Sequence, residues 1–147
     1  MTTHVHATCV ALRRGKTWRA ALLRGPSGAG KSDLALRLIE AGGRLVADDQ
    51  TELRREGKKL IASAPPRIAG LIEARGLGIL TLARDQLVKR TELVLLVDLA
   101  HPERIERLPE PASESVLDLE LPLIALAPFE ASSVAKLRLA LARIANA

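Results

Sequence analysis

The chain has 147 residues, of which 48% are hydrophobic and 27% are charged, and its formal net charge is +5. This length suits one domain with a single hydrophobic core, and the hydrophobic content excludes a disordered chain. The basic residues are scattered and the only aromatic side chains are Trp18 and Phe129, so nucleic-acid binding is not expected, because bases would find no stacking platform.

The first half of the chain predicts strands around one helix. A polar turn at 13–16 separates the first two strands, and Gly42 and Gly43 end the helix. In chain order, the predicted elements are strands at 5–12 and 18–23, a helix at 31–41, a short buried strand at 45–47, and a hairpin formed by 51–55 and 58–62.

The second half alternates strands with loops and ends in a helix that Ser132 or Ser133 can cap. Its predicted elements are a strand at 71–74, a glycine-rich turn at 75–78, a short helix at 82–89, strands at 93–97 and 121–127 around a charged loop at 102–111, and a helix over 132–147. Four apolar residues share one face of this last helix: Val134, Leu137, Leu141 and Ile144. Residues 1–147 are therefore predicted to form a single α/β domain with a mixed, partly parallel sheet and flanking helices.

The single Cys9 excludes an internal disulfide and fits a reducing compartment, where we expect its thiol to act as a small core group. Residues 1–4 do not begin a secretory signal peptide. No apolar run approaches the roughly 20 residues that a membrane-spanning helix needs. A cytoplasmic protein without membrane attachment is therefore expected.

The most informative segment is a complete phosphate-binding loop of the pattern G-x-x-x-x-G-K-[ST]. Its eight residues are Gly25, Pro26, Ser27, Gly28, Ala29, Gly30, Lys31 and Ser32. A predicted strand precedes the loop and a predicted helix follows it, which is the context that distinguishes this motif from a chance glycine-rich turn. Backbone N–H groups and the helix N-terminus would bind phosphate oxygens, Lys31 would reach the outer phosphates, and Ser32 would ligate Mg²⁺. We therefore predict a nucleotide-binding protein that uses Mg²⁺.

Three sets of acidic residues lie at or near predicted strands. Asp48 and Asp49 follow the strand after the loop's helix, Asp98 ends the strand at 93–97, and Glu73 lies in the strand at 71–74. Phosphoryl transfer to a hydroxyl needs a carboxylate that accepts the proton and acidic ligands for Mg²⁺. In a doubly wound sheet, the strand at 45–47 would lie beside the loop's own strand, with its carboxyl end at the nucleotide. For any one of these acidic residues, the alternative is a structural role in a turn.

His4 and His6 are two residues apart near the N-terminus, so they are predicted to lie on one face of the first strand. A single histidine on a strand is more often structural than catalytic. The pattern alone therefore assigns no chemistry to either residue.

The order of several short segments resembles the catalytic domain of the HPr kinase/phosphorylase family. The segments are His6-Ala7-Thr8, the phosphate-binding loop, the run from Arg44 to Asp49, and residues 71–79 with their Glu-x-Arg-Gly-Leu-Gly core. The last of these is close to the family signature. Together they span a little over half of the chain.

The resemblance implies an ATP-dependent kinase that phosphorylates a serine of an HPr-like phosphocarrier protein. It implies that Asp48 accepts the serine proton, that Lys31 holds the β- and γ-phosphates, that Ser32 and Glu73 bind Mg²⁺, and that His6 is the active-site histidine. Asp49 and Arg75 would lie in the same site. Because family members are typically hexamers, a homo-oligomer is also implied.

The chain departs from the family pattern at several places. The turn between His6 and the phosphate-binding loop is longer, Ala83-Arg84-Asp85-Gln86 replaces a glycine-rich segment, and residues 123–129 lack a basic stretch. The family's N-terminal domain and C-terminal helices are not present in these 147 residues. We therefore expect a short, core-only form with little or no phosphorylase activity.

Two other functions remain open from the sequence. A small-molecule kinase would share the loop, but it would have no need of the signature segment at 71–79. A nucleotide-binding sensor without catalysis would keep the fold and lack turnover.

Overall fold

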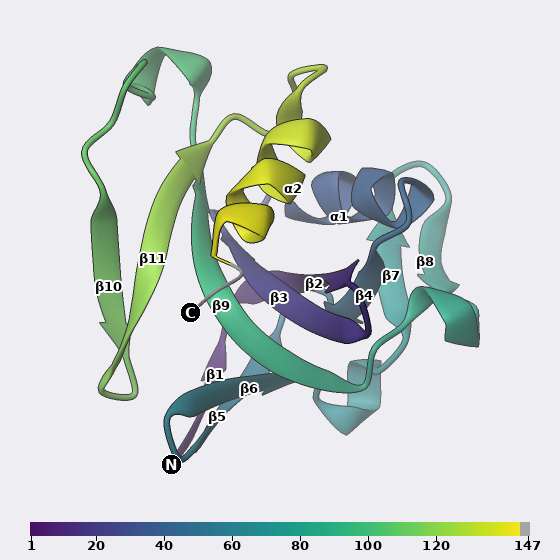
Figure 1. Ribbon diagram of the computed structural model, residues 1–147. Helices are drawn as coiled ribbons and strands as arrows, with labels where there is room; N and C mark the ends of the chain where they lie inside the picture. The colour runs from purple at the N-terminus through teal and green to yellow at the C-terminus, as the bar shows by residue number, and fades with distance from the viewer. Residues whose placement is uncertain (145–147) are drawn as a thin grey trace.

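The computed structural model describes residues 1–144, and its largest element is a curled mixed β-sheet with two helices on one side (Figure 1). The helices are α1 (Lys31–Glu40) and α2 (Ser133–Arg143). The described strands of the sheet are β1 (Thr2–Val5), β2 (Ala7–Arg14), β3 (Thr17–Arg24), β4 (Arg44–Ala47), β5 (Thr51–Glu56), β6 (Lys59–Ser63), β9 (Arg90–Leu99), β10 (Ala112–Val116) and β11 (Leu119–Leu126). A separate hairpin consists of β7 (Leu71–Ala74) and β8 (Gly78–Thr81).

The long strand β9 organises the sheet. One of its edges pairs in parallel with β3, the strand that leads to the phosphate-binding loop. Its other edge is shared: β6 pairs antiparallel with the first half, up to Leu93, and β11 pairs in parallel with the second half, from Leu96. The strand order is therefore β1-β5-β6-β9-β3-β2-β4, and the hairpin β10–β11 extends from β9 on the left of Figure 1.

The two faces of the sheet bury separate apolar clusters, because side chains alternate along each strand. On β3, Ala21 and Leu23 face one cluster, whereas Ala20 and Leu22 face the other. The helices cover the first cluster. Its buried members from the helices are Leu34, Ala35, Leu38 and Ile39 of α1 with Leu137 and Leu141 of α2.

The predicted apolar face of the last helix is confirmed at Leu137 and Leu141, and Val134 and Ile144 pack against the same cluster. The part of that helix predicted beyond residue 144 lies outside the described residues.

Two predicted placements near the N-terminus are wrong. The single strand predicted at 5–12 is two strands, and His6 lies between them, so His4 and His6 do not share one strand. The strand β4 does not lie beside β3, because β2 pairs antiparallel with both of them. This arrangement still points β3 and β4 in the same direction, so both strands end on the same side of the sheet.

The helix predicted at 82–89 is also wrong, because only a single 3₁₀ turn, Arg84–Gln86, forms there. The Gln86 side-chain oxygen accepts the Ala83 N–H at 2.9 Å, and the chain then extends, so that the Val88 N–H bonds the Leu45 carbonyl of β4 at 3.0 Å. Pairing of Leu87 and Val88 with the edge strand β4 therefore replaces the end of the expected helix.

The structure also adds two strands that the sequence did not predict. Strand β8 is exposed along its whole length, although it contains Ile79 and Leu80, and β10 is mostly exposed, so neither shows the alternation of apolar and polar residues that predicts a strand. Each is fixed by its hairpin partner, β7 or β11. Within the described residues, no helix is both long enough and apolar enough to cross a membrane.

Candidate active site

The phosphate-binding loop joins β3 to α1. Gly30, the residue before the helix, has a φ of 101°, which a residue with a side chain rarely adopts. A Cβ at this position would also lie 2.7 Å from the Cζ of Phe129, which is closer than two carbon atoms can approach. The backbone conformation therefore favours glycine at this point of the loop, whereas the exposed Phe129 ring could move aside to relieve the close contact.

The side chain of Lys31 bonds the first two residues of the phosphate-binding loop. Its ammonium group donates hydrogen bonds to the carbonyls of Gly25 at 2.5 Å and of Pro26 at 3.1 Å, and its side chain is almost fully buried. These bonds tie the first turn of α1 to the start of the loop. Pro26, Ser27 and Gly28 are exposed at its tip. The loop therefore presents its tip to solvent with a single cation held behind it.

Asp48 lies directly after β4 and is 7% exposed. One of its carboxylate oxygens accepts hydrogen bonds from the Ser32 hydroxyl at 2.6 Å and from the Thr8 hydroxyl at 3.0 Å. The other accepts the backbone N–H of Glu73 at 3.0 Å. One carboxylate thus joins the phosphate-binding loop, strand β2 and strand β7. All four segments that resemble the family meet at this residue.

Thr8 fixes both neighbouring aspartates. Its hydroxyl donates to Asp48 and accepts the backbone N–H of Asp49 at 3.1 Å, and the residue is fully buried. Asp49 takes a φ of 67°, so the chain turns sharply there and the two carboxylates diverge. The sequence analysis gave Thr8 no role. The available signal was a threonine within the otherwise apolar buried run Ala7, Cys9, Val10 and Ala11.

His6 and Asp49 form an exposed pair at the edge of this network. The Nε2 atom of His6 lies 2.7 Å from Oδ1 of Asp49, and more than half of each side chain is exposed. His6 therefore reaches the predicted site through Asp49, not through Asp48. His4 instead lies 3.3 Å from Glu52 on β5.

Glu73 enters the site through its backbone. Its N–H bonds Asp48, while its side chain is exposed on β7. Across residues 1–144, no three histidine, cysteine, aspartate or glutamate side chains are grouped as they would be to hold a metal ion. The Glu73 backbone therefore contacts Asp48, which also bonds Ser32, and the Glu73 side chain is exposed to solvent.

Asp98 differs from Asp48 in its surroundings. It pairs with Arg24 through two hydrogen bonds, of 2.7 and 3.2 Å, and Arg24 also bonds Glu114 of β10 at 2.6 and 2.9 Å. The hydrogen bond from Arg24 lowers the pKa of Glu114, and the bonds from Glu114 and Asp98 raise the pKa of Arg24. Asp98 is therefore part of an ion-pair network that links β3, β9 and β10.

Cys9 lies on β2 in the cluster on the face without helices and is fully buried. Burial in apolar surroundings raises the pKa of its thiol well above the usual range. Its predicted place in the core is confirmed, and a thiol in this state is unreactive.

The family model and the named proteins that are similar to this chain indicate the same family. The family model described as HPr Serine kinase C-terminal domain matches residues 2–143. The HPr kinase/phosphorylase of Geobacillus thermodenitrificans is 45% identical over 114 residues, which are 71% of this chain and 37% of that protein. The HPr kinase/phosphorylase of Xanthomonas campestris pv. campestris is 37% identical over 135 residues, or 84% of this chain and 43% of that protein.

A solved structure with a similar fold indicates the same family. The solved structure of the Hpr(Ser) kinase/phosphatase from Coxiella burnetii matches with a TM-score of 0.80 and 29% identity, over 96% of this chain and 88% of that one. The chain spans only about two fifths of the length of the two relatives described above. Since the family model covers almost every residue and the solved structure has the same fold, the chain belongs to the HPr serine kinase C-terminal domain family.

Proposed function

We propose that this chain is an ATP-dependent protein-serine kinase that phosphorylates an HPr-like phosphocarrier protein. The observation that carries the proposal is the 2.6 Å hydrogen bond between the Ser32 hydroxyl of the phosphate-binding loop and the Asp48 carboxylate. This contact supports the proposal because a carboxylate beside the phosphate-binding loop would lie close to a bound nucleotide and could accept a proton there. Membership of the family and the names of its similar proteins support the substrate.

ATP would bind through its phosphates. Residues 25–32, except Pro26, would supply backbone N–H groups, and α1 begins at Lys31, so its N-terminal dipole favours negative charge at the same point. The Lys31 ammonium would exchange its bonds to the Gly25 and Pro26 carbonyls for oxygens of the β- and γ-phosphates. This exchange keeps the buried cation paired before and after the nucleotide binds.

The side chains near the loop fit Mg²⁺, which prefers oxygen ligands. Mg²⁺ is commonly held by one or two protein side chains together with phosphate oxygens and water, so a cluster of three carboxylates is not required. Ser32 and Glu73 are the residues that would hold it. When bound, the ion would neutralise charge on the phosphates during transfer.

Asp48 would accept the proton of the attacking serine hydroxyl. An ionised carboxylate only accepts hydrogen bonds, and Thr8, Ser32 and the Glu73 N–H hold this one in a fixed orientation. Fixed orientation matters because a general base must lie within hydrogen-bond reach of the proton that it takes. His6, paired with Asp49, would lie at the exposed side from which a protein substrate approaches.

We also propose that the chain has little phosphorylase activity. We propose that it acts in the cytoplasm, where ATP and the carrier would be available. In the reverse reaction that the family resemblance implies, inorganic phosphate attacks the phosphoserine and releases pyrophosphate. A second anion must then be held in line with the phosphoserine. Two family segments beyond the signature differ here, because residues 83–86 replace a glycine-rich stretch and residues 123–129 lack a basic one.

The direct test is to incubate the full chain with Mg-ATP and candidate HPr-like carriers and to locate any phosphoserine by mass spectrometry. Phosphorylation of one serine of a carrier is the expected result. Transfer only to small hydroxyl compounds would indicate a small-molecule kinase. ATP binding without any transfer would indicate a nucleotide-binding sensor.

A further inference from the structure

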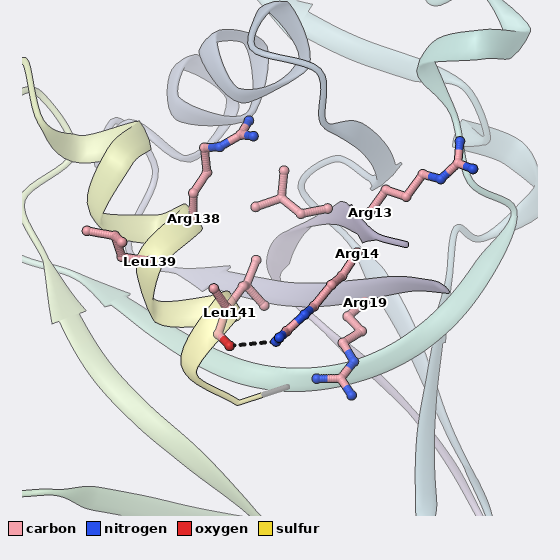
Figure 2. A pocket seen from close by; sticks show the side chains of 8 residues that line it. Arg13, Arg14, Arg19, Arg138, Leu139 and Leu141 are labelled. Atoms are coloured by element: carbon pink, nitrogen blue, oxygen red, sulfur yellow. Dashed lines mark hydrogen bonds between the residues drawn. The ribbon is translucent and has the colours of Figure 1, made fainter. Parts of the chain in front are cut away.

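A pocket of about 410 Å³ lies far from the phosphate-binding loop, between the turn that joins β2 to β3 and the second half of α2 (Figure 2). Its size falls within the range of small-molecule sites, which is roughly 300–1,000 Å³. None of the residues proposed above for kinase chemistry lines it. The pocket is therefore a separate feature of the fold.

The floor of the pocket is apolar. Leu12 lies opposite Arg19 on the neighbouring strand, and the buried Leu141 of α2 packs against the same face of the sheet. Leu139 is 64% exposed at the side of the pocket, although it belongs to a helix whose other leucines, Leu137 and Leu141, are buried. A ligand that covers the exposed apolar surface of this floor gains binding free energy in proportion to the area covered.

The rim of the pocket carries positive charge from three elements. Arg13 and Arg14 come from the end of β2, Arg19 from β3, and Arg138 from α2. Figure 2 shows their guanidinium groups spread around the leucines rather than gathered at one point. Among residues 1–144, no aspartate or glutamate lines this pocket. Arg24 elsewhere in the molecule is, by contrast, bonded to two carboxylates.

The fold holds these arginines in place through backbone carbonyls. Arg14 bonds the carbonyl of Ala142 at 2.9 Å, Arg138 bonds that of Ala41 at 2.7 Å, and Arg13 bonds that of Gly15 at 2.7 Å. Each of these bonds uses one of the five N–H donors of a guanidinium group. A carbonyl carries no net charge, so these bonds do not neutralise Arg13, Arg14 or Arg138, and their like charges repel one another.

We infer that this pocket binds a small organic anion that combines an apolar body with a carboxylate or phosphate group. The apolar body would cover Leu12, Leu139 and Leu141, and the anionic group would bond one or two of the rim arginines. Guanidinium groups suit both kinds of anion because their planar N–H donors match the oxygen pairs of either group. The inference does not depend on the kinase proposal.

Calorimetric titration of the full chain tests the inference with three simple probes. Octanoate has both features, acetate has only the charge, and octanol has only the apolar chain. Octanoate is expected to bind to one site, with affinity that falls as NaCl is added, and the other two probes are expected to bind much more weakly. Octyl phosphate is the second anion and should bind in the same way.

Substitutions of lining residues test whether octanoate binds in this pocket. Arg13→Gln combined with Arg138→Gln should weaken octanoate binding on the order of tenfold or more, because charge-assisted hydrogen bonds are lost. Leu139→Ser should weaken it as well, with little effect on folding because Leu139 is exposed. Arg143→Gln is the matched control, since Arg143 is exposed on the same helix and does not line the pocket. If the double variant fails to fold, Arg13→Gln alone decides, because its only described bond lies within its own turn.

The Lys31→Ala variant separates this site from the nucleotide site. Unchanged octanoate binding in that variant supports the inference, and its loss would place the anion on the phosphate-binding loop and overturn it. Equal binding of octanoate by the arginine variants would also overturn the inference. Sedimentation of the chain with phosphatidylglycerol vesicles, without binding of free octanoate, would show a lipid surface instead and reject a small-molecule site.

Discussion

At the scale of single residues, the site depends on how Asp48 is held. Two hydroxyl donors and one backbone N–H reach its two oxygens from three different segments. The sequence predicted the aspartate and the serine, because each stands in a recognisable motif. It did not predict Thr8, because one threonine in a buried strand has no sequence pattern of its own and its partner is 40 residues away.

The substitution Asp48→Asn should abolish most phosphoryl transfer, and Asp98→Asn should not. A general base contributes about 10²- to 10⁴-fold to the rate, and an amide cannot accept the serine proton. Asp98→Asn weakens an ion pair of a partly exposed Arg24, which affects stability by roughly 1 kcal/mol or less. Turnover at saturating Mg-ATP compares the two variants. An active Asp48→Asn with an inactive Asp98→Asn would reverse the assignment.

The substitution Lys31→Ala should reduce phosphoryl transfer by on the order of 10²-fold or more, because the charge-assisted contact to the phosphates is lost. The fold should remain, since the apolar neighbours of Lys31 on α1, not Lys31 itself, fill the core. Lys31→Met keeps the length of the side chain and removes the charge, so it controls for lost packing. Turnover and thermal unfolding are measured on the same samples. Full activity of either variant would contradict the role of Lys31.

The substitution Thr8→Val tests the positioning of Asp48. It keeps the shape of the side chain and removes both hydrogen bonds, so the turnover number should fall about tenfold while the KM for ATP stays nearly unchanged. Stability should fall by roughly 1–3 kcal/mol, because buried polar groups lose their partner. Thr8→Ser keeps the hydroxyl and should retain most activity. An unchanged turnover number in Thr8→Val would mean that Asp48 is held well enough without it.

At the scale of elements, the sequence predicted strands and helices wherever burial imposes a pattern. The strands β3, β4, β9 and β11 and the helix α1 were predicted because their apolar residues face a core. The chain at 82–89 was predicted wrongly, because its pairing with Leu45 depends on a tertiary contact. The exposed β8 and β10 were missed for the same reason, since only their hairpin partners determine them.

Strand β10 provides a prediction about pH. The hydrogen bond from Arg24 lowers the pKa of Glu114, so the folded pKa lies below the ordinary value of 4.5. A group with a lowered folded pKa stabilises the fold above its unfolded pKa, and this contribution is lost as the pH falls through the folded pKa. The difference in melting temperature between the wild-type chain and Glu114→Gln should therefore be largest near pH 7 and shrink below about pH 4.5.

The control for this experiment is Glu120→Gln. Glu120 lies on the partner strand β11 and bonds the Ser113 hydroxyl, with no arginine recorded against it in the described part of the chain. Its substitution should change the melting temperature less at pH 7. A difference between wild type and Glu114→Gln that stays constant down to pH 3 would show that Arg24 does not stabilise the ionised form of Glu114.

At the scale of the whole molecule, the sheet brings together residues that are distant in the sequence. Strands β3 and β4 end on the same side, although β2 separates them, so the loop after β3 and Asp48 after β4 meet. The doubly wound sheet considered from the sequence, with these two strands adjacent, also brought the loop and Asp48 together, although its strand order was wrong. The contact between the phosphate-binding loop and Asp48 was therefore predictable from motifs, whereas the strand order that produces it required the structure.

The last prediction concerns the direction of the reaction. We expect phosphoryl transfer from ATP to the carrier to be much faster than release of pyrophosphate from the phosphorylated carrier. Reversal needs inorganic phosphate held in line with the phosphoserine. Within the described residues, Lys31 is the cation that the phosphate-binding loop offers to such an anion. Since the loop can hold inorganic phosphate, slow reversal is compatible with this expectation. The phosphorylated carrier, Mg²⁺ and millimolar phosphate are supplied to the chain, and pyrophosphate is followed over time. Reversal at a rate comparable to the forward reaction would show that residues 1–147 suffice to hold both anions.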